Sequence, residues 1–448
     1  ARVRLAGERI SALCVELDGS ITGEHGVGIE KRAYMPLMHT PAELALMSHI
    51  KICFDPAGLL NPHKILPDLS EAPSDLPPVA SLPLQPSYQP QTAEDAAQIL
   101  AAHTAARQPL RLTGATAPQI TEMRPLSTAR LAGIQTLNLD DRYVVAGAGT
   151  RLVDLQAELA SQGVMIPAAS PWPEATLGGV FSAGVNAPLR LCYGALRDIA
   201  LALDVVLPNG QRICTGRPVM KNVAGYDLTR LFIGARGSLG LITALTLNLR
   251  PLPRRCLTFA VPFEQPAAAL AAGLALARNL LTASAVLVGQ NLGLPGLPEC
   301  MLICTLEGFD EDVAADDAVL HQQLSGCTFL EQPQTGSQIW TAWLGQTLTV
   351  DAAVARLGTP ISKLPSMVTR SSQHLGPAWL ADLGSGLFYA APTNALSCQT
   401  AAETVGGYLA WLGAPGSVAE TRRPGIPEWI DRLKSQLDPD GILPLLVS

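Results

Sequence analysis

Apolar positions recur at helical spacing near the start of the chain. Leu44, Met47, Ile50 and Phe54 follow one another at intervals of three or four residues, which predicts one apolar helix face. The helix should begin at Thr40, because the run T-P-A-E combines an N-cap hydroxyl, Pro at the first helical position and Glu three residues after the cap. The turn sequence D-P-A-G that follows Phe54 should end it.

Prolines then concentrate between residues 68 and 91, where the apolar periodicity is lost. A proline-rich stretch favours an extended chain. We therefore expect residues 68–91 to be a semi-extended linker between a helical first unit, residues 1–67, and the remainder.

Short β-rich runs separated by glycine turns follow the linker, after a second helix start at Thr92. This pattern predicts an α+β domain over residues 92–252. The expected strands lie at 110–112, 137–139, 143–146, 201–207, 212–215 and 239–249.

From Pro251 the order of elements changes to β-α-β-β-α-β, the split ferredoxin-like arrangement. We expect a ferredoxin-like α+β cap domain over residues 253–448, ending with a helix at 427–437. The expected elements are a strand at 257–263, a helix at 266–281, strands at 285–288 and 300–306, a helix at 310–324 and a strand at 327–330.

One sequence is repeated across the chain. The run D-P-x-G-[IL]-L follows a helix both at Asp55 and at Asp438, 383 residues apart. D-P-x-G is also a generic turn, so chance is an alternative. Because the preceding helix is repeated as well, we interpret the two runs as related C-terminal ends on one fused polypeptide.

Composition narrows the possible functions of the 448 residues. The chain is 48% hydrophobic and 15% charged with a net charge of −7, which allows cores for about three domains and argues against disorder and nucleic-acid binding. Nine cysteines without a C-x-x-C pair indicate reduced thiols in the cytosol and no iron–sulfur cluster of the chain's own. We expect no signal peptide and no transmembrane segment.

Two glycine-rich runs could border a cofactor. The run V-V-A-G-A-G-T at residues 144–150 lacks the third glycine of a dinucleotide fingerprint, since Leu152 stands there, so we reject a nicotinamide site. The run A-T-L-G-G-V-F-S-A-G at residues 175–184 would let the backbone approach a bulky ligand, with hydroxyls from Thr176 and Ser182. By itself, each glycine cluster is more commonly a tight turn.

Four motifs in a fixed order resemble a known family. T-L-G-G-x-x-x-x-G, Y-G-x-x-x-D, K-N-V-A-G-Y-D-L and G-S-L-G-L-I-T resemble the FAD-binding domain of the p-cresol methylhydroxylase/vanillyl-alcohol oxidase superfamily. K-N-V-A-G-Y-D-L is especially similar to the E subunits of bacterial glycolate oxidases. The resemblance covers about residues 92–448. It implies a domain of two α/β subdomains that binds FAD, followed by a cap domain.

The same resemblance implies the residues that hold FAD. These are backbone groups around Thr176, Gly178, Gly179, Ser182 and Gly184, with Leu241 and Ile242 near the adenine. Members of the superfamily carry an earlier glycine- and serine-rich pyrophosphate loop. The matching residues 113–118 hold a single glycine, Gly114, so we expect FAD to be bound less tightly.

The N-terminal unit contains an acid and a base between glycines. The carboxylate of Glu24 could ligate a divalent metal, and the imidazole of His25 could accept a proton near neutral pH. An ordinary surface loop is the alternative. G-E-H-G-[IV]-G followed by D-P-x-G-L-L-N-P resembles the C-terminus of the catalytic flavin subunit (D subunit) of glycolate oxidases and of D-lactate dehydrogenases.

That second resemblance implies that Glu24 is a metal ligand and that His25 is the catalytic base beside the flavin. The family supplies two further histidines from a motif that this chain lacks. His39 is expected instead to lie at a helix start. The site would be completed by another polypeptide, with the metal shared between the chains, or by a lost N-terminal part.

Together these features predict an FAD-binding subunit of a glycolate oxidase-like complex, which oxidises 2-hydroxy acids such as glycolate to 2-oxo acids such as glyoxylate. Expected partners are the catalytic flavin subunit and an iron–sulfur subunit that takes the electrons. The expected location is cytoplasmic, with peripheral attachment at the inner membrane through partners. A non-catalytic scaffold with a degenerate flavin fold is the alternative. A standalone oxidase ranks last, because residues 113–121 hold no His or Cys for a covalent flavin.

Overall fold

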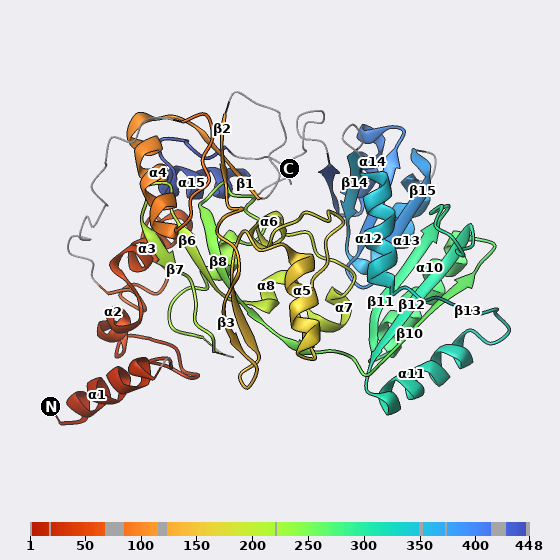
Figure 1. The fold of residues 1–448 in the computed structure, drawn as a ribbon, viewed down its shortest axis with the longest axis horizontal. Helices are drawn as coiled ribbons and strands as arrows, with labels where there is room; N and C mark the ends of the chain where they lie inside the picture. Colours follow the sequence, from red (N-terminus) through yellow and green to blue (C-terminus); the bar gives the residue numbers. More distant parts are fainter. Residues whose placement is uncertain are drawn as a thin grey trace.

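The computed structural model describes residues 2–17, 19–67, 85–114, 123–219, 222–348, 353–371, 374–413 and 427–444. The chain forms an N-terminal helical unit, a central domain and a cap domain, and the N-terminal unit and the cap lie on opposite sides of the central domain (Figure 1). Among the described helices, none is both long and apolar enough to cross a membrane.

The N-terminal unit consists of α1 (Arg2–Glu16), a short 3-10 turn at Arg32–Tyr34, α2 (Met35–Met38) and α3 (Pro41–Phe54). Helix α3 begins as predicted, because the Thr40 hydroxyl accepts the Glu43 N–H and the Glu43 carboxylate accepts the Thr40 N–H. Its apolar face buries Leu44 and Met47, whereas Phe54 is exposed to solvent.

The central domain is built on a five-stranded sheet with the order β3-β4-β8-β6-β7, in which all neighbours are antiparallel. These strands are β3 (Ile134–Asn138), β4 (Tyr143–Gly147), β6 (Ala200–Val206), β7 (Arg212–Cys214) and β8 (Leu241–Asn248). Smaller sheets pair β1 (Leu110–Thr113) with β2 (Arg124–Ser127), and β5 (Val164–Met165) with β9 (Arg250–Pro251). The helices are α4 (Ala93–Ala106), α5 (Leu152–Ser161), α6 (Leu177–Ala183), α7 (Arg190–Tyr193), α8 (Leu196–Ile199) and α9 (Thr229–Phe232).

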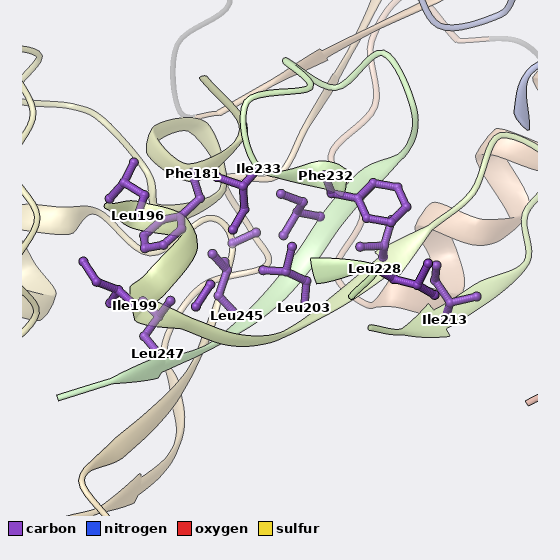
Figure 2. Packing of buried hydrophobic residues seen from close by; sticks show 14 of the residues in the cluster. Phe181, Leu196, Ile199, Leu203, Ile213, Leu228, Phe232, Ile233, Leu245 and Leu247 are labelled. Carbon is purple, nitrogen blue, oxygen red and sulfur yellow. The ribbon is translucent and has the colours of Figure 1, made fainter. Parts of the chain in front are cut away.

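The core of the central domain fixes α6 against the large sheet. Phe181 of α6 packs in one cluster with Leu203 of β6 and with Leu245 and Leu247 of β8 (Figure 2). All four side chains are fully buried. Burial of this kind stabilises by about 1.5–3 kcal/mol for each large apolar side chain, so α6 has little freedom to move.

The V-V-A-G-A-G-T run lies on β4 and in the turn after it, within an antiparallel sheet. A Cβ added at Gly149 would come within 2.0 Å of the Thr128 carbonyl oxygen. This glycine therefore serves close packing, in agreement with the rejection of a nicotinamide site.

The cap domain is one eight-stranded sheet with the order β13-β10-β12-β11-β15-β16-β14-β17. The strands are β10 (Arg255–Pro262), β11 (Ala283–Gln290), β12 (Cys300–Gly308), β13 (Leu330–Glu331), β14 (Ala353–Gly358), β15 (Leu375–Asp382), β16 (Leu387–Pro392) and β17 (Tyr408–Gly413). The helices are α10 (Pro266–Asn279), α11 (Asp310–Gln323), α12 (Gly336–Thr347), α13 (Leu364–Ser371) and α14 (Ala395–Thr404).

The first four cap strands, with α10 and α11, form the predicted β-α-β-β-α-β unit. The next four strands have the same order when read from the opposite edge of the sheet, so the cap holds two such units, of which one was predicted. The second unit was missed because its short apolar runs do not show whether they are strands or buried helices.

The chain leaves the cap before its last helix, α15 (Pro427–Leu437). Phe54 of α3 stacks on Trp429 of α15, with ring centroids 4.7 Å apart. Ile442 and Leu443, just after the helix, are buried with residues of α4 and β1 in the central domain. Sequence analysis assigned residues 253–448 to the cap, whereas residues 427–444 pack on the central domain and on the N-terminal unit.

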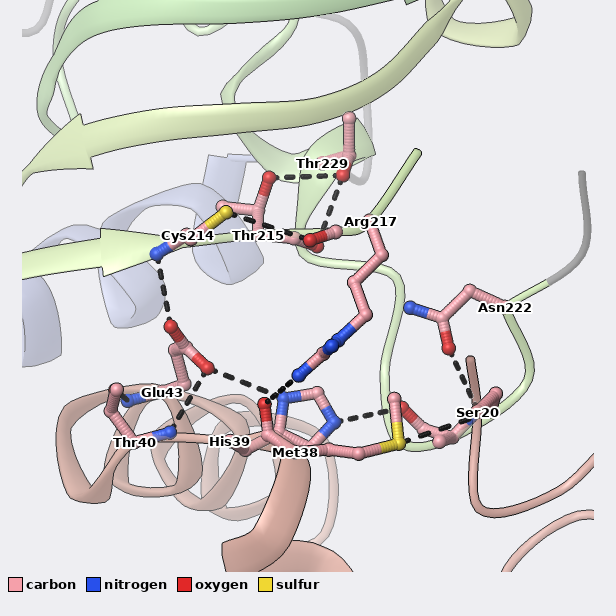
Figure 3. A network of polar contacts seen from close by, with 12 residues as sticks. Ser20, Met38, His39, Thr40, Glu43, Cys214, Thr215, Arg217, Asn222 and Thr229 are labelled. Carbon is pink, nitrogen blue, oxygen red and sulfur yellow. Dashed lines mark hydrogen bonds and ion pairs between the residues drawn. The ribbon is translucent and has the colours of Figure 1, made fainter. Parts of the chain in front are cut away.

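A buried carboxylate joins the N-terminal unit to the central domain (Figure 3). Glu43 is 4% exposed, and its Oε1 accepts the Cys214 N–H of β7 at 2.9 Å. His39 contacts Glu43 through Nδ1 and the Ala224 carbonyl through Nε2, at 3.3 and 3.1 Å. The expectation that His39 lies at a helix start is confirmed, and the same side chain also contacts the central domain.

We predict that Glu43→Gln lowers the free energy of unfolding by about 1–3 kcal/mol. The carboxylate accepts backbone N–H groups from Thr40 and from Cys214, and an amide NH₂ cannot accept one of them. Urea denaturation measures the loss. Glu30→Gln, at an exposed position, is the control and should change nothing. Equal stability of the two variants would contradict a role of Glu43 in joining the units.

A second buried carboxylate lies at the junction of the central domain and the cap. The hydroxyl of Tyr193, in the Y-G-x-x-x-D motif, donates to Glu307 of β12 at 3.1 Å. Burial raises the pKa of Glu307, and the hydrogen bond from Tyr193 opposes this rise. Because the folded protein holds this proton more tightly than the unfolded chain, Glu307 contributes stability at low pH, which is lost as pH rises through its folded pKa.

Tyr193→Phe should therefore raise the pKa of Glu307 further. We expect the variant to lose about 1–3 kcal/mol of unfolding free energy at pH 7.5 and much less below about pH 4, where the carboxyl is protonated. Urea denaturation at both pH values tests this. Tyr143→Phe on β4 is the matched control. A loss of the same size at both pH values would show that the hydrogen bond to the carboxylate is not the cause.

Candidate functional site

A cavity of about 310 Å³ lies between the central domain and the cap. Its walls come from the end of β1, from α6, from the start of β8 and from β17 of the cap. Six of the eight residues predicted to hold FAD line it: Gly114, Gly178, Gly179, Ser182, Leu241 and Ile242.

The two other predicted residues support this wall from behind. Thr176 is buried and caps α6, where its hydroxyl accepts the Gly179 N–H at 3.3 Å. It lines an adjoining cavity of about 280 Å³. Gly184 ends α6 with φ +65°, and an added Cβ would lie 2.8 Å from the Gly234 Cα. Gly184 is therefore required for close packing, and it does not line the cavity.

The two adjacent glycines of α6 have different roles. A Cβ at Gly178 would lie 2.8 Å from the Cβ of Ala148, so this glycine lets α6 approach the turn after β4. A Cβ at Gly179 would meet only the Thr176 hydroxyl, at 3.3 Å. Gly179 is thus the position where the missing side chain leaves room for a ligand.

The first backbone amides of α6 already have partners within the protein. Leu177 donates to the Thr150 carbonyl and Gly178 to the Ala148 carbonyl, both at 2.8 Å, and Gly179 donates to Thr176. Sequence analysis expected backbone groups here to hold the cofactor. These three amides are not free to donate hydrogen bonds to a cofactor. Hydrogen bonds to a cofactor must therefore come from other groups.

Two polar side chains on the cavity wall can supply such contacts. The Ser182 hydroxyl has no hydrogen-bond partner among the described residues. Arg236 is the one charged residue among the described lining residues. Its N–H donates to the Ser182 carbonyl at 2.8 Å, and its backbone has φ +53°. Positive φ is uncommon for arginine, which marks this turn as strongly constrained.

Sequence analysis missed Arg236 and two aromatic residues, Trp172 and Trp411, which also line the cavity. Arg236 stands directly before the G-S-L-G-L-I-T motif, so its neighbourhood could have indicated it. Trp411 comes from the cap, and no local sequence pattern connects it with α6.

Some predicted features fall on residues outside those described. These are residues 68–84 of the predicted linker, residues 115–118 of the predicted first loop, which follow Gly114, and Lys221 of the K-N-V-A-G-Y-D-L motif. Among the residues that are described, the lining fits a bulky planar cofactor. Its small side chains allow close approach, two indoles border it, and its volume lies at the lower end of the range of about 300–1,000 Å³ for ligand pockets.

Glu24 and His25 lie apart from this cavity. Both are exposed, in the loop between α1 and α2, and neither lines the cavity or the one adjoining it. The base of this loop is held by the Lys31 ammonium, which donates to the Ile21 carbonyl at 2.9 Å. Within the described part of the chain, no three His, Cys, Asp or Glu residues gather in a way that could hold a metal.

Two family profiles match the chain. One, described as FAD linked oxidases, C-terminal domain, matches residues 1–65, and the other, FAD binding domain, matches residues 86–216. The chain is 38% identical over 128 residues to glycolate oxidase subunit GlcE of Escherichia coli, covering 28% of this chain and 37% of that protein. It is 32% identical over 196 residues to glycolate oxidase subunit GlcD of Bacillus subtilis, covering 41% and 42%.

A third relative is the mitochondrial D-lactate dehydrogenase [cytochrome] of Arabidopsis thaliana, 26% identical over 282 residues, covering 57% of this chain and 50% of that protein. The chain thus spans half or less of the length of these three relatives.

Solved structures share the fold. A p-cresol methylhydroxylase with bound substrate superimposes with a TM-score of 0.61 at 16% identity, over 80% of this chain and 87% of that one. An alkyldihydroxyacetonephosphate synthase gives 0.60 at 15% identity, over 80% and 75%. These matches confirm the predicted fold class, and the profiles confirm the resemblance stated from the motifs. Residues 1–65 and 86–216 are thus similar to FAD-linked oxidases, and the chain has the fold of p-cresol methylhydroxylase.

Proposed function

We propose that the chain is the FAD-binding subunit of a complex that oxidises 2-hydroxy acids, with glycolate converted to glyoxylate. The observation that carries this proposal is the cavity between the central domain and the cap, since five residues implied by the family motifs line it, together with Gly114 of the first loop. Similarity to two different glycolate oxidase subunits supports the choice of complex.

FAD, when bound in this cavity, would accept the electrons that the flavin of the catalytic subunit takes from the substrate. We assign the remaining roles to the residues of the cavity. Gly179 leaves room for the cofactor, the Ser182 hydroxyl donates a hydrogen bond, and the Arg236 guanidinium balances negative charge. Trp172 and Trp411 border the cavity from the central domain and the cap, where their indoles limit the access of water.

We place His25 and Glu24 in a second, composite site. Both side chains are exposed. Exposure is required if residues of another polypeptide are to complete their site. On this proposal His25 removes the substrate hydroxyl proton beside the flavin of the catalytic subunit, and Glu24 ligates a divalent metal whose other ligands come from that subunit. All nine cysteines of this chain are free thiols, so we assign electron transfer to an iron–sulfur partner. The complex would be cytoplasmic, attached to the inner membrane through its partners.

A non-catalytic scaffold is the second candidate, and one observation favours it. The first three amides of α6 are bonded within the protein, and Gly114 is the single glycine of the first loop. Both features reduce the number of donors that a diphosphate could use. On this candidate the cavity would hold no FAD, and the domain would position the catalytic subunit.

A substitution at Gly179 tests whether the cavity binds FAD, provided that its effect on FAD affinity is measured separately from its effect on the stability of the fold. We expect Gly179→Val to weaken FAD binding at least about tenfold, because the new side chain enters the cavity. The melting temperature without FAD should fall no more than in Gly345→Val. That control is also a helical glycine whose Cβ would meet a single atom at 3.3 Å, but it does not line the cavity. Equal FAD affinity of the two variants, measured by flavin fluorescence, would remove Gly179 from the site.

The proposed function itself is tested by reconstitution. Purified chain mixed with FAD should retain flavin after gel filtration, and adding the catalytic and iron–sulfur subunits should give glycolate-dependent dye reduction. Retention of no flavin would contradict the role of the chain as a flavoprotein and favour the scaffold.

Replacement of His25 tests the composite site in the same assembly. His25→Asn should lower kcat by about 10²–10⁴-fold, the usual effect of losing a general base. His63→Asn is the matched control, since His63 is also exposed and asparagine tolerates its positive φ of 59°. Unchanged turnover of His25→Asn would exclude His25 as the base.

A further inference from the structure

The sequence that is repeated in the chain extends beyond the turn, because both copies also share a lysine before the turn. Both read K-x-x-x-D-P-x-G-[IL]-L, beginning at Lys51 and at Lys434. The lysine lies in the last turn of α3 in one copy and near the end of α15 in the other. We call Lys51–Leu60 the first clip and Lys434–Leu443 the second clip.

The second clip is a closed, buried unit. The Lys434 ammonium donates to the Asp438 carboxylate and, at 2.6 Å, to the Leu443 carbonyl. The same carboxylate accepts the N–H groups of Ile442 and Leu443, at 3.0 and 2.9 Å. These bonds fold the chain back over the helix end and present Ile442 and Leu443 side by side.

The first clip has the same internal bonds. Lys51 donates to the Asp55 carboxylate and, at 2.6 Å, to the Leu60 carbonyl. Asp55 accepts the N–H groups of Leu59 and Leu60, at 2.9 and 2.8 Å. The glycines that allow the turn, Gly58 and Gly441, both have φ +66°. The two clips are therefore one structure used twice.

Their surroundings differ sharply. Ile442 and Leu443 are each 1% exposed, whereas Leu59 and Leu60 are 78% and 63% exposed. Lys434 has a further acceptor in the Ser238 carbonyl at 2.6 Å, and the Ile442 carbonyl accepts the Leu110 N–H at 2.8 Å. The second clip is covered by a neighbour, and the same apolar pair of the first clip faces solvent.

The neighbour of the second clip is the FAD-binding domain. Ile442 and Leu443 fill a groove whose walls include Leu100 of α4, Leu110 of β1, Val206 of β6 and Leu241 of β8. The polar contacts at Leu110 and Ser238 come from the same domain. This groove shows which kind of surface a clip of this sequence and shape binds.

We propose that the first clip docks into the corresponding groove of a second FAD-binding domain, that of the catalytic flavin subunit. This proposal rests on the proposed function for its partner. Residues 1–65, which include the first clip, match the C-terminal domain of FAD linked oxidases, so they are the part that would accompany such a domain. The groove in this chain is filled by the second clip, so the partner must have its groove open.

Docking of this kind has a geometric consequence. Phe54 and Trp429 stack, so the helices that carry the two clips are in direct contact. With each clip in its own groove, the pair α3 and α15 would join two FAD-binding domains. The stacked rings would then form part of the interface within the complex.

The test mixes full-length chains without substrate. The first acceptor carries Ile442→Asp and Leu443→Asp to open its groove, and Leu60→Asp to disable its own first clip. The second acceptor is full-length B. subtilis GlcD, a relative of the proposed catalytic subunit. Wild-type chain is the donor, and Leu60→Asp is the test donor. Leu281→Asp is the matched control, because Leu281 is 89% exposed and lies in the cap domain. Circular dichroism checks that each acceptor is folded, and sedimentation velocity measures binding.

We expect the wild-type donor to bind at least one acceptor. The Leu60→Asp donor should bind at least about tenfold more weakly, the expected loss from one large apolar side chain, and Leu281→Asp should bind like wild type. Failure of both acceptors to bind, or equal binding of the Leu60→Asp donor, would overturn the proposal. A lower melting temperature of the isolated Leu60→Asp chain would also overturn the proposal, because Leu60 would then be covered within its own chain. Because no turnover is measured, loss of docking is distinguishable from failure of the glycolate assay.

Discussion

The close approach of α6 to the turn after β4 is the contact on which the candidate site depends. Gly178 and Ala148 touch because Gly178 has no side chain, and the amides of Leu177 and Gly178 donate to carbonyls of that turn. This contact fixes the helix, so Gly179 and Ser182 face the cavity. The same bonds use the amides that a helix start would otherwise offer to a phosphate. At this helix, the amides that hold the tight packing are therefore not free to donate hydrogen bonds to an anion.

Two buried carboxylates join the three parts of the molecule around that contact. Glu43 accepts hydrogen bonds across the boundary of the N-terminal unit, and Glu307 accepts one across the boundary of the cap. A buried carboxylate is tolerated because backbone or hydroxyl donors satisfy it. Both boundaries combine these polar bonds with apolar burial, since Met35 and Met47 share a cluster with the central core and Val185 shares one with the cap.

The N-terminal unit is bound firmly on one side and uncovered on another. Leu44 and Met47 are buried, and Leu59 and Leu60 are exposed. Local sequence cannot distinguish these two faces, because both are apolar. Comparison with Ile442 and Leu443 distinguishes them, since the same clip is covered at the other end of the chain. An exposed apolar pair held in a defined shape is more informative than scattered surface leucines.

The sequence by itself determined the helix starts at Thr40 and Thr92, most strands of the central sheet and the first half of the cap, because capping bonds and apolar periodicity act over a few residues. The motif order also indicated five of the cavity residues, and the first loop indicated Gly114. Tertiary structure alone decided that Trp411 joins them, that residues 427–444 return to the central domain, and that the first amides of α6 are already bonded. Those outcomes depend on contacts between residues that are far apart in the chain. The burial and hydrogen bonding of such residues are determined only when the whole domain packs.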